Sequence, residues 1–169
     1  MRLCPPAVLS KDHALVGFDC GVKNMNAWLL QTARKWQRGG GCQVMVLADE
    51  QRQVKAFYAL SAGQISRERA PKPMQRNAPD PLPVVVMGRL AVSLDCQGKS
   101  VATSLMLDAF DRVLAVRETI GVTALMVHAL SEDVVPFYEK FGFHPAPAEG
   151  SHLLLFKRVK DMAAEVALR

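Results

Sequence analysis

One stretch of the chain constrains the fold more than any other, because a strand, a turn and a long helix follow one another between residues 84 and 120. Residues 84–92 form an apolar run rich in Val, which favours a buried strand. Residues 93–98 are typical of a turn, and from residue 101 to residue 120 apolar residues recur at steps of three and four. This helix has an apolar stripe that can cover a sheet, so the stretch predicts an α/β fold.

The remaining patterns fit the same fold class. We expect helices over residues 22–36 and 131–140, a hairpin of strands 43–48 and 54–62, and strands at 122–128 and 153–159. Residues 66–83 hold five prolines, which predicts a long loop without helix or central strand. The order predicts an α/β (α+β) architecture, with a mixed central sheet flanked by helices in one domain covering residues 1–169.

Composition excludes several other classes. Cys4, Cys20, Cys42 and Cys96 lie far apart, without a C-x-x-C pair or a histidine at zinc-ligand spacing, so neither a metal site nor a disulfide framework is expected. There is no apolar leader at the start and no run of eighteen apolar residues. We expect a cytoplasmic protein that does not enter a membrane.

The turn before the long helix has the properties of a phosphate-binding loop. The first backbone amides of a helix have no acceptor inside the helix, and small residues let a phosphate approach them. The residues concerned are Gln97, Gly98, Lys99, Ser100, Val101 and Ala102. An ordinary helix start with Ser100 as N-cap is the alternative interpretation.

A second alternative for this turn is a nucleoside triphosphate loop, because Gly98, Lys99 and Ser100 mimic its last three positions. The first glycine of that motif would fall at Ser93, and His128 ends the next strand where a magnesium-binding aspartate is expected. The triphosphatase interpretation is therefore the weaker one.

Positive charge is concentrated in one part of the chain. The net charge is +5, and between residues 23 and 76 ten basic residues face only three acidic ones. Such asymmetry favours a polyanionic partner, although a well-solvated surface would give the same count.

Beyond these patterns, the sequence resembles the GNAT superfamily of acetyltransferases, and within it the toxins of the TacT and AtaT type. The family motif Q/R-x-x-G-x-G/A is matched by Gln97 and Ala102, with Ser100 where glycine is usual. The resemblance extends over most of the chain, through segments 18–21, 28–29, 79–81, 88–92, 127–131 and 137–143.

The resemblance implies acetyl-CoA as co-substrate and no metal. It assigns coenzyme binding to the loop residues above, to the strand residues Leu90, Ala91 and Val92, and to Phe141. It also implies that Tyr138 protonates the leaving thiolate. The alternative is that Tyr138 is one more core aromatic beside Phe137 and Phe143.

The absence of an evident general base limits which kind of amine can accept the acetyl group. An α-amino group, with a pKa of about 8, is partly neutral at cellular pH, whereas lysine, at about 10.4, is not. The resemblance points the same way, since it implies acetylation of the amino acid on an aminoacyl-tRNA and a block of translation. The residues expected to contact tRNA phosphates are Lys23, Arg34, Lys35, Arg38, Arg67, Arg69, Lys72, Arg76 and Arg89.

The resemblance further implies a homodimer and a ribbon-helix-helix antitoxin, with operator DNA bound only through the toxin and antitoxin complex. Two other functions stay open. One is a GNAT enzyme for a small amine or a protein N-terminus. The other is a binding module weakened in catalysis by Ser100.

Overall fold

The computed structural model describes residues 1–147 and 153–168, and it divides into two compact units. Unit 1 comprises Met1–Ser61 and Gly88–Ala109, and unit 2 comprises Ala62–Met87 and Phe110–Arg169. Strands β3 (Val54–Ile65) and β4 (Leu82–Val92) and helix α4 (Val101–Arg117) run from one unit into the other. The single domain over residues 1–169 stays a prediction.

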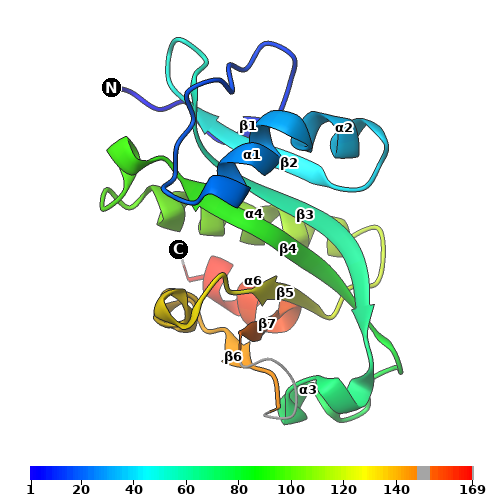
Figure 1. Ribbon diagram of the computed structural model, residues 1–169. Coiled ribbons are helices and arrows are strands. Elements are labelled where there is room, and N and C mark those ends of the chain that lie inside the picture. Colours follow the sequence, from blue (N-terminus) through cyan, green and yellow to red (C-terminus); the bar gives the residue numbers. More distant parts are fainter. Residues whose placement is uncertain (148–152, 169) are drawn as a thin grey trace. The chain divides into compact units, whose positions relative to one another are not determined.

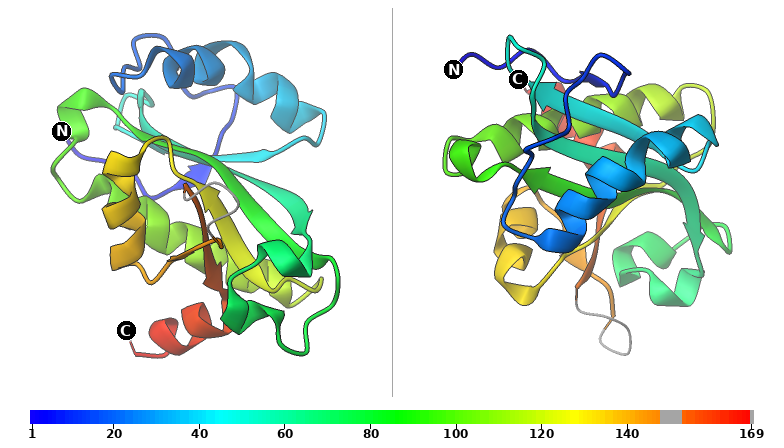
Figure 2. Two further views of the ribbon diagram at one scale, coloured as in Figure 1. Left: turned by 60° about the horizontal axis from the view of Figure 1, so that its bottom comes forward. Right: turned by 45° about the horizontal axis from the view of Figure 1, so that its top comes forward.

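In unit 1, antiparallel strands carry two helices on one face (Figure 1). Strand β1 (Ala7–Val8) pairs with β2 (Gln43–Ala48), which pairs with β3, and the end of β4 follows as the next strand. Helices α1 (Lys23–Gln31) and α2 (Ala33–Arg38) lie over the strands, as the right view of Figure 2 also shows. Trp28 stacks on Phe57 with ring centroids 5.8 Å apart, so α1 is fixed to the sheet by aromatic packing.

The hairpin of β2 and β3 is confirmed, but the single helix expected over residues 22–36 is wrong. The structure interrupts it at Thr32, whose φ of −122° is not helical, and α2 begins one residue later. A β-branched residue loses side-chain freedom in a helix, which makes this position a favourable place for a break.

In unit 2, parallel and antiparallel pairings occur in the same sheet. Strand β4 is parallel to β5 (Ala124–His128), and β5 is antiparallel to β7 (Leu154–Arg158), which also pairs with β6 (His144–Pro145). The strand order in this unit is β3-β4-β5-β7-β6. The expected mixed sheet with flanking helices is thereby confirmed.

The helices of unit 2 are the end of α4 together with α3 (Lys72–Gln75), α5 (Val135–Lys140) and α6 (Val159–Val166). The prediction that residues 66–83 hold no helix is wrong, because α3 forms with Pro73 near its start, where the missing N–H removes no hydrogen bond. Helix α6 and strands β1 and β6 were not predicted.

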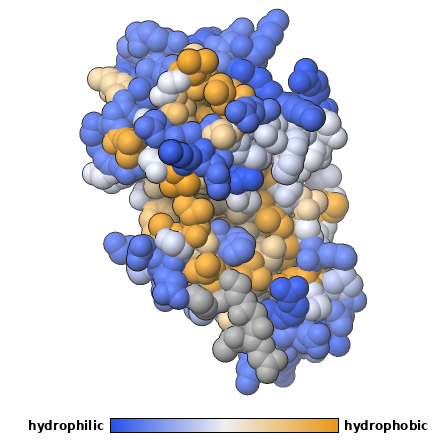
Figure 3. All heavy atoms as spheres, in the orientation of Figure 1, coloured by the Kyte–Doolittle hydropathy of each residue, from blue (hydrophilic) through white to orange (hydrophobic). Residues whose placement is uncertain are grey.

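The surface combines hydrophilic residues with exposed apolar ones, as Figure 3 shows for one face. On the helices of unit 1, Leu30 is 52% and Trp36 is 50% exposed. Within the described residues, no helix combines the length and the apolar character needed to cross a membrane.

Candidate active site

The loop between β4 and α4 is held in place by the side chain of Gln97. Its Nε2 donates to the carbonyl of Val92 at 2.9 Å and to the carbonyl of Cys20 at 3.1 Å. Both amide hydrogens are thus used within unit 1, and they tie the loop to the end of β4 and to the turn before α1. Gln97 can therefore offer a ligand its backbone N–H but no free side-chain donor.

The loop backbone adopts left-handed conformations at two positions. The φ angle is 73° at Gly98 and 61° at Ser100. Ser100 directly precedes α4 and its carbonyl accepts from the Ser104 N–H at 3.2 Å, so it is the N-cap by position, but its φ is not extended and its hydroxyl makes no capping bond to a described residue. Ser100 instead has the backbone conformation that glycine adopts without cost.

Helix α4 begins directly after Ser100 with open donors. The N–H groups of Val101, Ala102 and Thr103 donate no hydrogen bond to the described backbone or side chains. A Cβ placed on Gly98 would meet no atom within 4 Å, so the space in front of the loop is open. Open donors at a helix start favour an anion such as phosphate.

Charged groups surround the same loop. The Asp95 carboxylate accepts from Lys55 Nζ at 2.8 Å and from the Ser93 hydroxyl. These bonds, first of all the one from Lys55, lower the pKa of Asp95 to about 2. Lys99 Nζ donates to the carbonyl of Asp95 at 2.9 Å, which keeps its charge close to the loop.

Strand β4 ends in unit 1 with the three residues expected to hold the pantetheine arm. Ala91 is buried in the unit 1 core, whereas Leu90 and Val92 are partly exposed. The backbone N–H of Ser93 donates to the carbonyl of Lys55 at 2.8 Å, which fixes the end of this strand against β3.

In unit 2, Tyr138 lies on α5 among aromatic side chains. Its ring centroid is 5.3 Å from that of Phe137 and 5.6 Å from that of Phe143, and both pairs meet edge to face. Only 7% of Tyr138 is exposed, and burial raises the pKa of its hydroxyl to about 12. The hydroxyl makes no hydrogen bond to a described residue. Tyr138 therefore combines core packing with a free, protonated hydroxyl.

Phe141 directly follows α5, and its carbonyl accepts a hydrogen bond from the Nζ of Lys157 on β7. Its ring centroid lies 5.1 Å from that of Phe137 and 6.2 Å from that of Phe110. Lys157 is 1% exposed, so a buried cation closes the helix that carries Tyr138.

The basic residues expected to bind RNA differ in their surroundings. In unit 1, Lys23, Lys35 and Arg38 are exposed. Arg89 is partly buried, with its guanidinium 4.6 Å from the centroid of the Trp28 ring. It forms no ion pair with a described residue, so its charge is available to an anion.

The prediction that Arg34 contacts RNA has to be corrected. Its Nη2 donates to the carbonyls of Ser10 at 3.1 Å and His13 at 2.5 Å, and its Nε is buried without a partner. The side chain holds the N-terminal segment onto α2, so these donors are not available to an RNA phosphate.

In unit 2, the bases of the proline-rich segment are exposed. Arg67 donates from Nη1 to the carbonyl of Ala78 at 3.2 Å, whereas Arg69, Lys72 and Arg76 have no ion pair with described residues. Sequence patterns missed three further cations near Arg76, namely Arg117, Arg158 and Lys160. Arg158 and Lys160 are two residues apart, but Arg76 and Arg117 lie far from them in the sequence and no motif joins the four, so no local signal could have grouped them.

Among the described residues, no group of three or more His, Cys, Asp or Glu side chains is placed to hold a metal ion. The mixed sheet and the phosphate-type loop after β4 together define an acyl-CoA-dependent acetyltransferase domain, and residues 75–152 match the acetyltransferase (GNAT) domain family.

Comparison with related proteins shows which group of GNAT acetyltransferases the chain resembles. A tRNA-acetylating toxin of Mycobacterium tuberculosis is 33% identical over 159 residues, which cover 94% of this chain and 94% of the relative. The structure of AtaT complexed with acetyl-methionyl-tRNAfMet is 28% identical, with a TM-score of 0.89 and coverage of 99% and 100%. A mutant AtaT bound to the C-terminus of the antitoxin AtaR and acetyl-CoA is 27% identical, with a TM-score of 0.82 and 97% coverage of each chain. The chain therefore belongs to the GNAT N-acetyltransferases, in the family of the tRNA-acetylating toxins.

Proposed function

We propose that this protein transfers the acetyl group of acetyl-CoA to the α-amino group of an aminoacyl-tRNA and thereby blocks translation. The observation that carries the proposal is the loop after β4, where open N–H groups at the start of α4 follow a left-handed turn. The similarity to a tRNA-acetylating toxin and to AtaT bound to acetyl-methionyl-tRNAfMet supports the acceptor.

In this proposal the loop binds the coenzyme pyrophosphate. The N–H groups of Val101 and Ala102 are the donors, Gly98 leaves room for the phosphates, and Lys99 adds a positive charge. Leu90, Ala91 and Val92 hold the pantetheine arm through backbone hydrogen bonds, and Phe141 supplies apolar contact. A backbone N–H of this strand can also stabilise the developing oxyanion, which requires no special side chain.

Acetyl-CoA supplies a thioester, and the acceptor amine attacks its carbonyl carbon. The carbon–sulfur bond then breaks, the thiolate leaves, and the amine proton passes to solvent. Tyr138 donates a hydrogen bond to the thiolate. With a pKa of about 12 for Tyr138 and about 8.5 for a thiol, full proton transfer is uphill by roughly 5 kcal/mol. Tyr138 therefore acts as a donor that stabilises the thiolate until solvent protonates it.

The tRNA binds through its phosphates in this proposal. The contacting residues are Lys23, Lys35, Arg38 and Arg89 in unit 1, and Arg67, Arg69, Lys72 and Arg76 in unit 2. Each neutralised phosphate releases counterions, so raising salt from about 50 to 200 mM should weaken binding by orders of magnitude.

We also propose the assembly that the family resemblance implies. The protein is a cytoplasmic homodimer, inhibited by a ribbon-helix-helix antitoxin, and it reaches operator DNA only within that complex. The antitoxin-bound AtaT supports the inhibitory partner. Exposed Leu30 and Trp36 on unit 1 offer apolar area of the kind that protein partners cover.

The test is to incubate the protein with labelled acetyl-CoA and bulk charged tRNA, and to identify the labelled amino acid by mass spectrometry. Tyr138→Phe should lower kcat at least tenfold while keeping the fold, because the hydroxyl has no partner to lose. Tyr58→Phe is the matched control, since it removes the only other tyrosine hydroxyl, which bonds Asp108 in unit 1. Label found on free amines or on protein N-termini, with none on tRNA, would contradict the proposal.

A further inference from the structure

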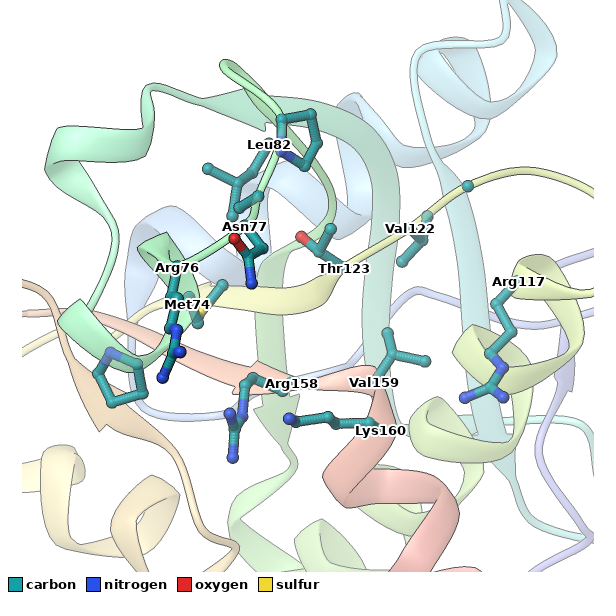
Figure 4. Close-up of a pocket in the computed structure, with 14 residues that line it drawn as sticks. Met74, Arg76, Asn77, Leu82, Arg117, Val122, Thr123, Arg158, Val159 and Lys160 are labelled. Atoms are coloured by element: carbon teal, nitrogen blue, oxygen red, sulfur yellow. The ribbon is translucent and has the colours of Figure 1, made fainter.

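A pocket of about 450 Å³ lies in unit 2, and none of the residues predicted to bind coenzyme lines it. Its walls come from α3 and the segment after it, from the first residue of β4, from the approach to β5, and from the junction of β7 with α6 (Figure 4). Its volume falls within the range of about 300 to 1000 Å³ typical of small-molecule sites.

Cationic side chains gather on one side of this pocket. Arg76, Arg158 and Lys160 all line it, and in the view of Figure 4 their charged ends lie in the same part of the pocket. Arg117 lines the pocket as well, farther along. These residues come from separate elements, so the fold itself assembles the positive charge.

The negative charge near these cations is limited. Arg158 donates to Asp161 from Nε at 2.9 Å and from Nη2 at 3.3 Å, which fixes the guanidinium and leaves Nη1 free. Arg117 has only a loose contact of 3.9 Å to Glu118. Arg76 and Lys160 form no ion pair with a described residue, and no acidic side chain is among the residues lining the pocket. The pocket thus has a net positive charge that a ligand can neutralise.

Apolar side chains also line the pocket. Leu82 and Val122 lie on the far side of Thr123 from Arg158 and Lys160, Val159 lies beside Lys160, and Asn77 and Thr123 add polar groups. The Thr123 hydroxyl already donates to the carbonyl of Pro83 at 2.8 Å, so its lone pairs remain available to a donor. A ligand that fits this arrangement has a phosphate at one end and a flat, weakly polar ring at the other.

We infer that this pocket is a binding site for a nucleotide unit. The phosphate lies between Arg76, Arg158 and Lys160, and the base lies against the apolar side chains. The unit is either a free mononucleotide or one nucleotide of an RNA strand, because both present the same chemistry. The pocket shares Arg76 with the proposed tRNA surface, so its RNA form rests on the proposed function, whereas binding of a free mononucleotide does not depend on acetyl transfer.

The test measures binding without acetyl-CoA, by calorimetry, for adenosine monophosphate, adenosine, inorganic phosphate and a single-stranded RNA hexamer. Lys160→Ala and Arg76→Ala are the test variants, because both side chains are exposed and their removal should leave the fold intact. Lys11→Ala removes the same charge from an exposed position in unit 1 and is the matched control.

We expect adenosine monophosphate to bind at least about tenfold more tightly than adenosine or phosphate, and each test variant to weaken it about tenfold, as for loss of a charge-assisted hydrogen bond. If only the RNA hexamer binds, and each test variant weakens its binding about tenfold, the site is also supported, and the nucleotide unit belongs to an RNA strand. Equal affinity for phosphate and adenosine monophosphate would overturn the inference. So would binding that the test variants weaken no more than Lys11→Ala does, or no binding of any of the four ligands.

Discussion

Lys157 Nζ lies 2.6 Å from Glu165 Oε1, so a cation on β7 is paired with a carboxylate on α6. Lys157 also donates to the carbonyl of Phe141, and its Nζ is 4.8 Å from the centroid of the Phe110 ring. A Cβ at Gly142 would come within 3.1 Å of this Nζ. The buried lysine thus links the turn after the Tyr138 helix to β7 and to the last helix.

Removing the carboxylate should weaken this arrangement. Glu165→Gln leaves the buried ammonium with one carbonyl and an amide oxygen, which should lower the free energy of unfolding by about 1 to 3 kcal/mol. Thermal unfolding measures the effect. Glu118→Gln is the control, since the ion pair of Glu118 spans 3.9 Å at the surface and should contribute less than about 0.5 kcal/mol. Equal losses in both variants would contradict the assigned role of Lys157.

Ser100→Gly should make the protein more stable. A side chain in the left-handed region costs about 1 to 2 kcal/mol, which the substitution removes. About half of this gain is lost again, because glycine has more conformational freedom in the unfolded chain. We expect the free energy of unfolding to rise by about 0.5 to 1 kcal/mol in denaturant titrations. Ser104→Gly, inside α4, should lower it by a similar amount. A loss of stability in Ser100→Gly would show that φ at this position is not left-handed.

The raised pKa of Tyr138 predicts the form of the pH–rate profile. The rate should rise as the acceptor amine loses its proton near a pKa of about 8 and then stay level to about pH 10, because Tyr138 remains protonated. A decline beginning near pH 9, absent from Tyr138→Phe, would mean that the hydroxyl ionises earlier than its burial implies.

Stability should depend on the same hydroxyl. Its folded pKa of about 12 lies above the unfolded value of about 10, so its contribution is fully present below about pH 10 and is lost as pH rises toward 12. The free energy of unfolding should fall across that window in the native protein and fall less in Tyr138→Phe. Identical pH dependence in both proteins would exclude the effect.

Asp95 should affect the free energy of unfolding at acid pH, whereas Tyr138 affects it at alkaline pH. Its folded pKa is about 2, below the ordinary value of 3.8, so its contribution is present above about pH 4 and is lost as pH falls toward 2. Asp95→Asn should remove that part of the acid dependence of unfolding and should loosen the coenzyme loop. Asp12→Asn, an exposed substitution of the same kind in unit 1, is the matched control.

The sequence predicted those elements whose signal is local. The apolar runs of β4 and β5 and the stripe of α4 are continuous patterns, and the structure has all three. Helix α3 was not predicted because of Pro73, since proline usually ends helices but is accepted in the first turn. Lys157 could not be predicted as a core residue, since its burial depends on Glu165 and on a carbonyl supplied by another element.

The candidate site was predictable to the same extent. The loop could be found from its motif, but not the left-handed φ at Ser100, because propensity alone disfavours that conformation for serine. The structural role of Arg34 and the grouping of Arg76, Arg158 and Lys160 arise from tertiary contacts that no local spacing encodes.

The two hydrogen bonds from Gln97 have a consequence for the kinetics of coenzyme association. They hold the loop between β4 and α4 in its turn before any ligand arrives, so its conformational entropy is already lost when the chain folds. Association should then be a single diffusional step whose rate rises linearly with coenzyme concentration, without a slower phase of loop closure. Gln97→Ala should introduce such a phase, even though no donor that could face the ligand has been removed.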